Sequence, residues 1–347
     1  MRVQLSARDS SHTFECNEGE TILRAGLRHG VGLPYECASG TCGTCKAALA
    51  AGEVDEGWGA APGRTFLKAD GNEILMCQAA ARTDCTLTVR GRVRPLGEAD
   101  MVPGRHSGVL ESVTPLNRDV FRLDVRLGAP IAFDAGQFML VGHADFAGQR
   151  GLSMANFERP TDHLVFTIKL KAGGGLSDWL SGRDRTGARL DLFGPLGSAI
   201  YRAGEVDGIL CIAGGSGLAP MLSILELARS VGHFAVHDGH IFFGARTLDD
   251  LYGVDELVAV RAAFPERVSL TIALSEEAPG AGPEGRWPGV AFAAGFVHEV
   301  AGLAMAGKYD GVTAYLAGPP PMVEGAMRML VSQAKLPPTR IRYDKFS

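Results

Sequence analysis

Apolar and polar positions follow three different patterns along the chain. Residues 1–92 begin with an alternating run around Gln4 and continue into a helix-like stretch around Leu23, which predicts a small α+β unit. Residues 106–203 carry short apolar runs separated by Gly, Pro and Asp, as expected of an antiparallel β-barrel. Residues 204–347 alternate between buried strand, glycine turn and helix, which predicts a parallel sheet with helices on its faces.

A short segment rich in turn residues separates the first two patterns. It contains Pro95, Gly97, Pro103 and Gly104 and few apolar residues, which is typical of a linker. The chain of 347 residues also exceeds the roughly 100 to 200 residues of a single domain. We therefore expect a multidomain protein with an α+β domain (1–92), a linker (93–105), an antiparallel β-barrel domain (106–203) and an α/β parallel-sheet domain (204–347).

Composition excludes several classes of protein. A hydrophobic content of 46%, a charged content of 21% and a net charge of -5 describe an ordinary folded protein. Acidic and basic residues are interspersed, so no basic stripe for nucleic acid is expected. The most apolar stretches are interrupted by Pro220 and by His298 and Glu299, which argues against a membrane span. The first residues do not resemble a signal peptide, and we expect a cytoplasmic protein.

Four of the seven cysteines have a spacing that suggests a metal centre. Three of them form a C-x4-C-x2-C pattern and the fourth follows in a later segment: Cys37, Cys42, Cys45 and Cys77. This is the plant-type spacing for a [2Fe-2S] cluster, which needs four thiolates. The residues alone leave two alternatives, a zinc site with four thiolates and an accident of buried cysteines. The other cysteines lie in or beside apolar runs and are expected to be buried free thiols: Cys16, Cys85 and Cys211.

With this cysteine pattern, residues 1–92 resemble the ferredoxin domain fused in front of oxygenase reductases. The rest of the chain resembles the ferredoxin-NADP reductase superfamily, so the resemblance covers essentially the whole sequence. It implies a β-grasp ferredoxin domain, a flavin-binding barrel and a nucleotide-binding α/β domain. It also implies a reductase that uses NADH, FAD and a [2Fe-2S] cluster.

Two segments of the barrel resemble the flavin motifs of this superfamily. Residues 150–156 are similar to R-x-Y-S, and residues 173–180 are similar to G-G-x-x-S-x-x-L. A guanidinium suits the FAD pyrophosphate, a small hydroxyl suits the flavin N5 edge, and Ser177 is expected to cap the helix that follows the glycines. Leu152 stands where relatives have a tyrosine that contacts the flavin. The candidate flavin ligands are Arg150, Leu152, Ser153, Met154, Gly173, Gly174 and Ser177, and FAD is favoured over FMN because the glycine turn would serve the pyrophosphate.

The α/β domain carries the candidate nucleotide site. A glycine-rich turn after a buried strand lets backbone amides meet a pyrophosphate, although it is not a G-x-G-x-x-G fingerprint. Two later segments resemble superfamily segments that border the nucleotide, and the full candidate set is Gly214, Gly215, Gly217, Pro220, Arg246, Gly318, Pro319 and Met322. NADH is favoured over NADPH because acidic residues 249 and 250 follow Arg246 and no second basic residue is expected nearby to neutralise a 2′-phosphate.

The mechanism implied by the resemblance assigns catalytic roles to Ser153 and Phe346. Ser153 would lie near the flavin N5, and Phe346 matches the aromatic residue that relatives stack on the flavin. The alternative for Phe346 is that it belongs to a frayed C-terminal tail. Hydride arrives as two electrons and the cluster accepts one, so a flavin is expected between them. The expected partner is the oxygenase component, or its intermediary ferredoxin, of an aromatic or alkene monooxygenase, because residues 154–156, 318–322 and 343–346 look most like reductases of toluene-type diiron enzymes. A reductase of a Rieske ring-hydroxylating dioxygenase and a redox-sensing flavoprotein without turnover are the alternatives.

Overall fold

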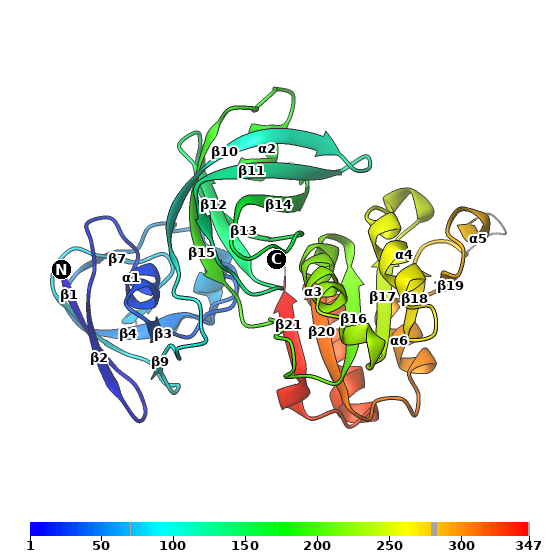
Figure 1. Cartoon of the computed structure of the whole chain (residues 1–347). Coiled ribbons are helices and arrows are strands. Elements are labelled where there is room, and N and C mark those ends of the chain that lie inside the picture. The colour runs from blue at the N-terminus through cyan, green and yellow to red at the C-terminus, as the bar shows by residue number, and fades with distance from the viewer. Residues whose placement is uncertain (70, 172, 279–282, 346–347) are drawn as a thin grey trace.

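The computed structural model describes residues 1–69, 71–171, 173–278 and 283–345, and three bodies follow one another along the chain (Figure 1). The first is an α+β body at one end of the molecule, the second is a barrel, and the third is a parallel sheet with helices. The edge strand β21 (Ile341–Lys345) of the third body lies toward the other two. This arrangement confirms the predicted fold class.

The first body is built on a mixed sheet with the strand order β2-β1-β8-β4-β6. Its strands are β1 (Arg2–Ser6), β2 (Ser11–Glu15), β4 (Lys46–Ala51), β6 (Glu73–Leu75) and β8 (Cys85–Thr88). The helix α1 (Ile22–Arg28) buries Ile22, Leu23 and Leu27 against this sheet. Two small sheets complete the body, one joining β3 (Val31–Gly32) to β9 (Arg94–Pro95) and one joining β5 (Val54–Asp55) to β7 (Ala80–Ala81).

The segment expected to be a linker is partly attached to the first body. The strand β9 pairs with β3, and the Leu96 amide donates to the Gly30 carbonyl at 2.7 Å. The Val93 carbonyl accepts a hydrogen bond from Ser10. Backbone groups of residues 93–96 therefore continue the first domain, because they find partners there. The domain boundaries stay a prediction.

The second body is an antiparallel sheet with the order β13-β12-β15-β10-β11-β14. Its strands are β10 (Gly104–Pro115), β11 (Val120–Ile131), β12 (Phe138–His143), β13 (Phe146–Ser153), β14 (Thr161–Lys169) and β15 (Arg189–Leu196). A bridge between Met154 and Phe166 joins the two edges of the sheet, which closes it into a barrel. The short helix α2 (Gly175–Leu180) packs beside β13.

The third body is a fully parallel sheet with the order β19-β18-β17-β16-β20-β21. The other strands are β16 (Gly208–Gly214), β17 (Gly239–Ala245), β18 (Val268–Leu274), β19 (Ala291–Ala294) and β20 (Val312–Gly318), and the helices are α3 (Leu218–Ser230), α4 (Val254–Ala263), α5 (Pro283–Arg286), α6 (Val297–Ala304) and α7 (Pro320–Arg328). Side chains of β16 alternate between two cores, Cys211 facing α3 and Leu210 facing α6 and α7. The strand order reverses between β16 and β20, where open α/β sheets bind ligands.

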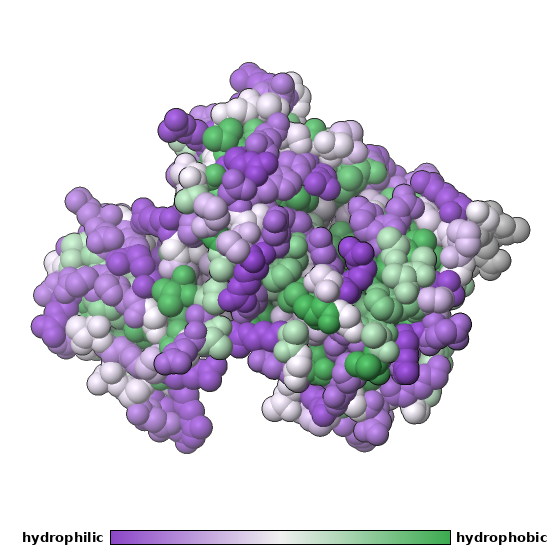
Figure 2. All heavy atoms as spheres, viewed as in Figure 1, coloured by the Kyte–Doolittle hydropathy of each residue, from purple (hydrophilic) through white to green (hydrophobic). Residues whose placement is uncertain are grey.

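Apolar packing also joins the first body to the barrel. Phe138, Leu140, Phe193 and Leu196 of the barrel belong to the same buried cluster as the core of the first body. The face shown in Figure 2 is mostly hydrophilic, with hydrophobic residues scattered over it. Among the described helices, none combines the length and apolar character that crossing a membrane requires.

Candidate functional site

The loop that carries three of the four candidate cluster ligands wraps around its own sulfur atoms. The amides of Thr41 and Cys42 point at the Cys37 Sγ at 3.3 and 3.4 Å, and the Thr44 amide points at the Cys42 Sγ at 3.5 Å. Gly43 adopts a left-handed conformation with φ +73°, which favours glycine. Amides that donate to sulfur stabilise its thiolate form and tune the potential of a bound cluster.

The four thiols lie as two pairs. A hydrogen bond from Cys42 lowers the pKa of the Cys37 thiol to about 4, and a hydrogen bond from Cys45 likewise lowers the pKa of Cys77. Among the described residues, no three His, Cys, Asp or Glu side chains converge as ligands of one metal ion. Two pairs of thiols suit a cluster of two irons, each of which takes two thiolates.

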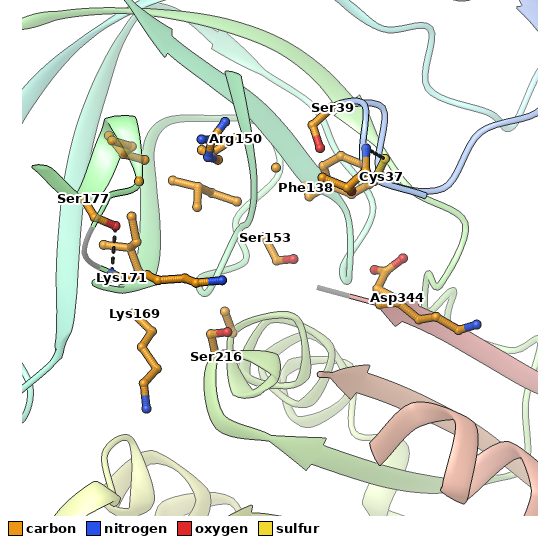
Figure 3. A pocket seen from close by; sticks show the side chains of 18 of the residues that line it. Cys37, Ser39, Phe138, Arg150, Ser153, Lys169, Lys171, Ser177, Ser216 and Asp344 are labelled. Atoms are coloured by element: carbon orange, nitrogen blue, oxygen red, sulfur yellow. Dashed lines mark hydrogen bonds between the residues drawn. The ribbon is translucent and has the colours of Figure 1, made fainter. Parts of the chain in front are cut away.

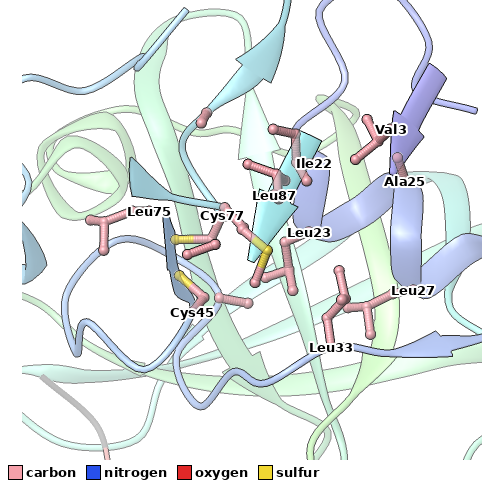
Figure 4. Packing of buried hydrophobic residues seen from close by; sticks show 14 of the residues in the cluster. Val3, Ile22, Leu23, Ala25, Leu27, Leu33, Cys45, Leu75, Cys77 and Leu87 are labelled. Carbon is pink, nitrogen blue, oxygen red and sulfur yellow. The ribbon is translucent and has the colours of Figure 1, made fainter. Parts of the chain in front are cut away.

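The remaining cysteines are buried away from this loop. Cys16, Cys85 and Cys211 are free and buried, as expected from their apolar surroundings. Within the pairs, Cys45 and Cys77 are enclosed by the core of the first body, where Leu23 and Leu75 also lie (Figure 4).

A cavity of about 480 Å³ lies where the three bodies meet (Figure 3). Its wall includes Cys37 of the cysteine loop, Arg150 and Ser153 of the barrel, and Ser216 and Asp344 of the α/β body. The Ser153 side chain is 4% exposed and its Oγ has no hydrogen-bond partner among the described residues. The Thr167 Oγ1 lies on the same wall and is also buried without a hydrogen-bond partner among the described residues. Buried hydroxyls without partners at a cavity wall fit a polar cofactor that would bond to them.

The predicted flavin residues divide into those that reach this cavity and one that does not. Those on the cavity wall are Arg150, Leu152, Ser153, Gly173, Gly174 and Ser177. Arg150 donates only to the neighbouring Gln149 carbonyl, at 3.2 Å, and has no carboxylate partner among the described residues, so its guanidinium is available for a phosphate. Met154 is the exception. Its backbone pairs with Phe166 to close the barrel, and its side chain is fully buried in the barrel core and does not line the cavity.

The expected capping role of Ser177 is wrong. Gly174 occupies the N-cap position with an extended backbone, and Ser177 lies inside the first turn of α2. Its Oγ instead accepts a hydrogen bond from the Lys171 amide at 3.0 Å. The serine therefore ties the glycine turn to the helix, and the turn passes along the cavity wall.

The glycine turn of the α/β body meets the second nucleotide segment at the switch point. A Cβ on Gly214 would lie 3.2 Å from Met322 Cε and 3.5 Å from Pro319 Cδ, so these residues touch. A Cβ on Gly217 would lie 2.0 Å from the Ala317 carbonyl oxygen, so only glycine lets the turn approach β20 this closely. Gly318, with φ +148°, closes the same junction, and Pro220 is buried in the first turn of α3 as expected.

Arg246 has a different environment from the one expected. It forms a bidentate ion pair with Asp250, with N···O distances of 2.8 and 3.1 Å. Arg118 of the barrel donates to the same carboxylate at 2.8 Å. The expectation that no second basic residue lies near Arg246 is therefore wrong in space, because the barrel supplies Arg118 from another part of the chain. Both guanidiniums are paired with one carboxylate, which would compete with a 2′-phosphate for them.

Asp344 is a cavity residue that the sequence patterns did not single out. Its Oδ2 has no hydrogen-bond partner among the described residues. Burial, reinforced by the charge of Glu36, raises the pKa of the Asp344 carboxyl from 3.8 to about 7. Phe346, the predicted flavin-stacking aromatic, lies outside the described residues.

The raised pKa of Asp344 predicts a pH-dependent loss of stability. Below about pH 4 the carboxyl is protonated in both the folded and the unfolded chain. Between pH 4 and 7 the carboxyl is ionised in the unfolded chain but still protonated in the folded chain. The free energy of unfolding therefore falls as the pH rises through this window. Asp344→Asn should remove the loss and stabilise the holoprotein by about 2 kcal/mol at pH 8 but not at pH 4. Denaturant unfolding at both pH values measures this, with the exposed Asp249→Asn as control; an equal effect of Asp344→Asn at both would contradict it.

Comparisons with known proteins agree with this geometry. Residues 6–82 match the 2Fe-2S iron-sulfur cluster binding domain, and residues 211–328 match the oxidoreductase NAD-binding domain. The chain is 36% identical over 347 residues to the ferredoxin–NAD(+) reductase component of the alkene monooxygenase system of Xanthobacter autotrophicus, covering 97% of this chain and 99% of the relative.

The chain belongs to this family of iron-sulfur flavoprotein reductases.

Two further similarities extend over nearly the whole reductase. It is 33% identical to the xylene/toluene monooxygenase electron transfer component of Pseudomonas putida, covering 94% of this chain and 89% of the relative. The solved ferredoxin reductase in carbazole 1,9a-dioxygenase has a TM-score of 0.84 and 31% identity, covering 100% of this chain and 99% of that chain. The reductase therefore uses a [2Fe-2S] cluster, FAD and NADH, as its sequence predicted.

Proposed function

We propose that this reductase passes electrons from NADH, through FAD and the [2Fe-2S] cluster, to the oxygenase component of a multicomponent monooxygenase acting on alkenes or aromatic hydrocarbons. The observation that carries the proposal is that Cys37, Ser153 and Ser216 line one cavity. These residues come from the cluster loop, the flavin barrel and the nucleotide turn, so a donor, a carrier and an acceptor of electrons would meet there. We also expect a reducing cytoplasmic location, because the cluster needs thiolates.

Different residues around the cavity would hold each cofactor. Arg150 and the glycine turn at 173–174 would hold the FAD pyrophosphate, and the unpartnered Ser153 hydroxyl would orient the flavin ring. The turn at 214–217 would bring the NADH pyrophosphate against backbone amides. When bound, FAD accepts the hydride of NADH and releases electrons singly. The four thiols Cys37, Cys42, Cys45 and Cys77 would hold the cluster that receives them.

Direct contacts hold the cluster loop at this cavity. The Gly197 amide of the barrel donates to the Tyr35 hydroxyl at 3.0 Å, two residues before Cys37. The Tyr343 hydroxyl donates to Glu36 at 3.3 Å, so β21 also holds the loop. These contacts support electron transfer within one chain, because they bring the cluster loop to the flavin wall without a separate docking event.

Relatives favour a monooxygenase partner and leave a second candidate. The reductase is similar to components of alkene, xylene/toluene and phenol monooxygenases, at 30 to 36% identity. It is also 33% identical to the ferredoxin–NAD(P)(+) reductase of Metapseudomonas resinovorans and similar in structure to the reductase in carbazole 1,9a-dioxygenase. A Rieske ring-hydroxylating dioxygenase is therefore the second candidate, and an intermediary ferredoxin between reductase and oxygenase is compatible with both.

Reconstitution tests the proposed partner. The holoprotein is titrated with a purified diiron hydroxylase and its coupling proteins, and separately with a Rieske oxygenase with and without its ferredoxin. Substrate-dependent NADH consumption and hydroxylated product are measured. We expect both with the diiron system; stimulation by the Rieske system alone would overturn the monooxygenase assignment. Steady NADH oxidation with an artificial acceptor, in the same samples, separates a reductase from a sensor without turnover.

A further inference from the structure

Arg24 places a cation between the cluster-binding part of the first body and the flavin barrel. It lies on α1, whose Ile22 and Leu23 amides donate to the carbonyls of Ala79 and Met76 at 2.8 and 2.9 Å. These two carbonyls flank Cys77 along the chain, so the helix is bonded directly to the segment of that thiol. Figure 4 shows Ile22, Leu23 and Cys77 within one buried cluster.

The guanidinium of Arg24 points away from the first body and into the barrel. It donates to the Gln149 Oε1 on β13, the residue before Arg150. Its Cζ also lies 5.4 Å from the centroid of the Phe193 ring, which is 1% exposed. Its Nε is buried and has no hydrogen-bond partner among the described residues. The cation is therefore held in an apolar interface by a neutral amide and an aromatic ring.

No carboxylate neutralises this cation among the residues that the structure describes. Glu20 is a nearby acid and is 0% exposed, but both of its oxygens accept hydrogen bonds from Arg28, at 3.1 and 2.9 Å. Burial lowers the pKa of the Arg24 guanidinium and the charge of Arg105 lowers it further, whereas the charges of Glu20 and Cys77 raise it. Arg24 thus carries a positive charge that is hydrogen-bonded to no acid among the described residues and that solvent screens poorly.

We propose that Arg24 raises the reduction potential of the [2Fe-2S] cluster and so draws the electron from the flavin side to the cluster side. Reduction adds one negative charge to a group that its four thiolates already make anionic, and a poorly screened cation nearby stabilises that added charge. The cation also reaches β13, so the same side chain stands between the two cofactor sites. The inference rests on the cluster assignment made above and is independent of which oxygenase the reductase serves.

The test is a potentiometric titration of the intact holoprotein, followed by the electron paramagnetic resonance signal of the reduced cluster. In Arg24→Met, the ratio of reduced to oxidised cluster at a fixed applied potential should fall on the order of tenfold, which for one electron is a shift of about 59 mV to more negative potential. Arg24→Lys keeps the charge and should stay near wild type. Arg8→Met, which removes an exposed arginine from the same domain, should leave the potential unchanged.

Two outcomes would overturn the proposal. An unchanged midpoint potential in Arg24→Met with full iron and sulfide content would show that the charge does not act on the cluster. An equal shift in Arg24→Lys would assign the effect to lost contacts. If Arg24→Met does not load its cluster, the same titration is made on Arg24→Gln, which keeps an amide donor toward Gln149 and removes the charge. Its midpoint potential is then judged by the same criterion. A wild-type protein with no signal of a reduced [2Fe-2S] cluster would instead overturn the cluster assignment itself.

Discussion

Replacing Cys77 by serine should stop electron delivery beyond the flavin while the flavin still oxidises NADH. Cys77 is 4% exposed and paired with Cys45 inside the first body, so its replacement removes one of the two thiolates of this pair. A hydroxyl is a poor ligand for iron in a cluster of this kind. We expect reduction of cytochrome c, a one-electron acceptor, to fall by at least about 100-fold. Ferricyanide reduction through the flavin should persist.

The control for this prediction is Cys85→Ser in the same domain. Cys85 is buried, and its thiol donates to the carbonyls of Glu53 and Thr83 at 3.6 and 3.3 Å, bonds that a serine hydroxyl can also make. This variant should keep the visible bands of the cluster and both activities. Cytochrome c reduction by Cys77→Ser at the wild-type rate would contradict the assignment of this residue as a ligand.

Replacing Gly217 by alanine should disable the nucleotide site. The added Cβ would lie 2.0 Å from the Ala317 carbonyl oxygen and 2.3 Å from its carbon. Both are backbone atoms, so the turn after β16 would have to move away from β20 at the switch point. We expect the free energy of unfolding to drop by about 3 kcal/mol and the KM for NADH to rise by about 100-fold. Thermal unfolding and the NADH dependence of ferricyanide reduction measure these two effects.

Gly215→Asn is the matched control in the same turn. Gly215 has φ +52°, a conformation that asparagine tolerates, and a Cβ there would meet no atom within 4 Å. This variant should change the free energy of unfolding by less than about 1 kcal/mol. If Gly217→Ala kept the wild-type stability while Gly215→Asn lost it, the close approach of the turn to β20 would not be what shapes the site.

Local spacing explains why the cluster and the fold class were predictable. The thiols of Cys37, Cys42 and Cys45 lie in one short loop, so their separation along the chain nearly determines their separation in space. The continuous run of buried residues on β16 and the glycine turn after it likewise express contacts within one strand-turn-helix unit. The expected helix cap at Ser177 failed even at this short range, because Gly174 can adopt the extended cap conformation and takes that position instead.

Residues that act across domains could not be read from local patterns. Arg118 and Asp250 are 132 positions apart, and Arg24 and Gln149 are 125 positions apart, yet each pair is hydrogen-bonded. Asp344 becomes a cavity residue only because β21 is the edge strand that faces the barrel and the cluster loop.

The sequence by itself determined the class of each domain and the ligand types of each cofactor, because hydrophobic periodicity, cysteine spacing and glycine turns act over a few residues. Only the tertiary structure decided that the cysteine loop, Ser153 and Ser216 share one cavity, and which charges near it are paired. Those features depend on how three separately patterned domains pack, and the free energy of that packing comes from contacts between residues far apart along the chain. The position of Arg24 between the two redox sites belongs to this second group.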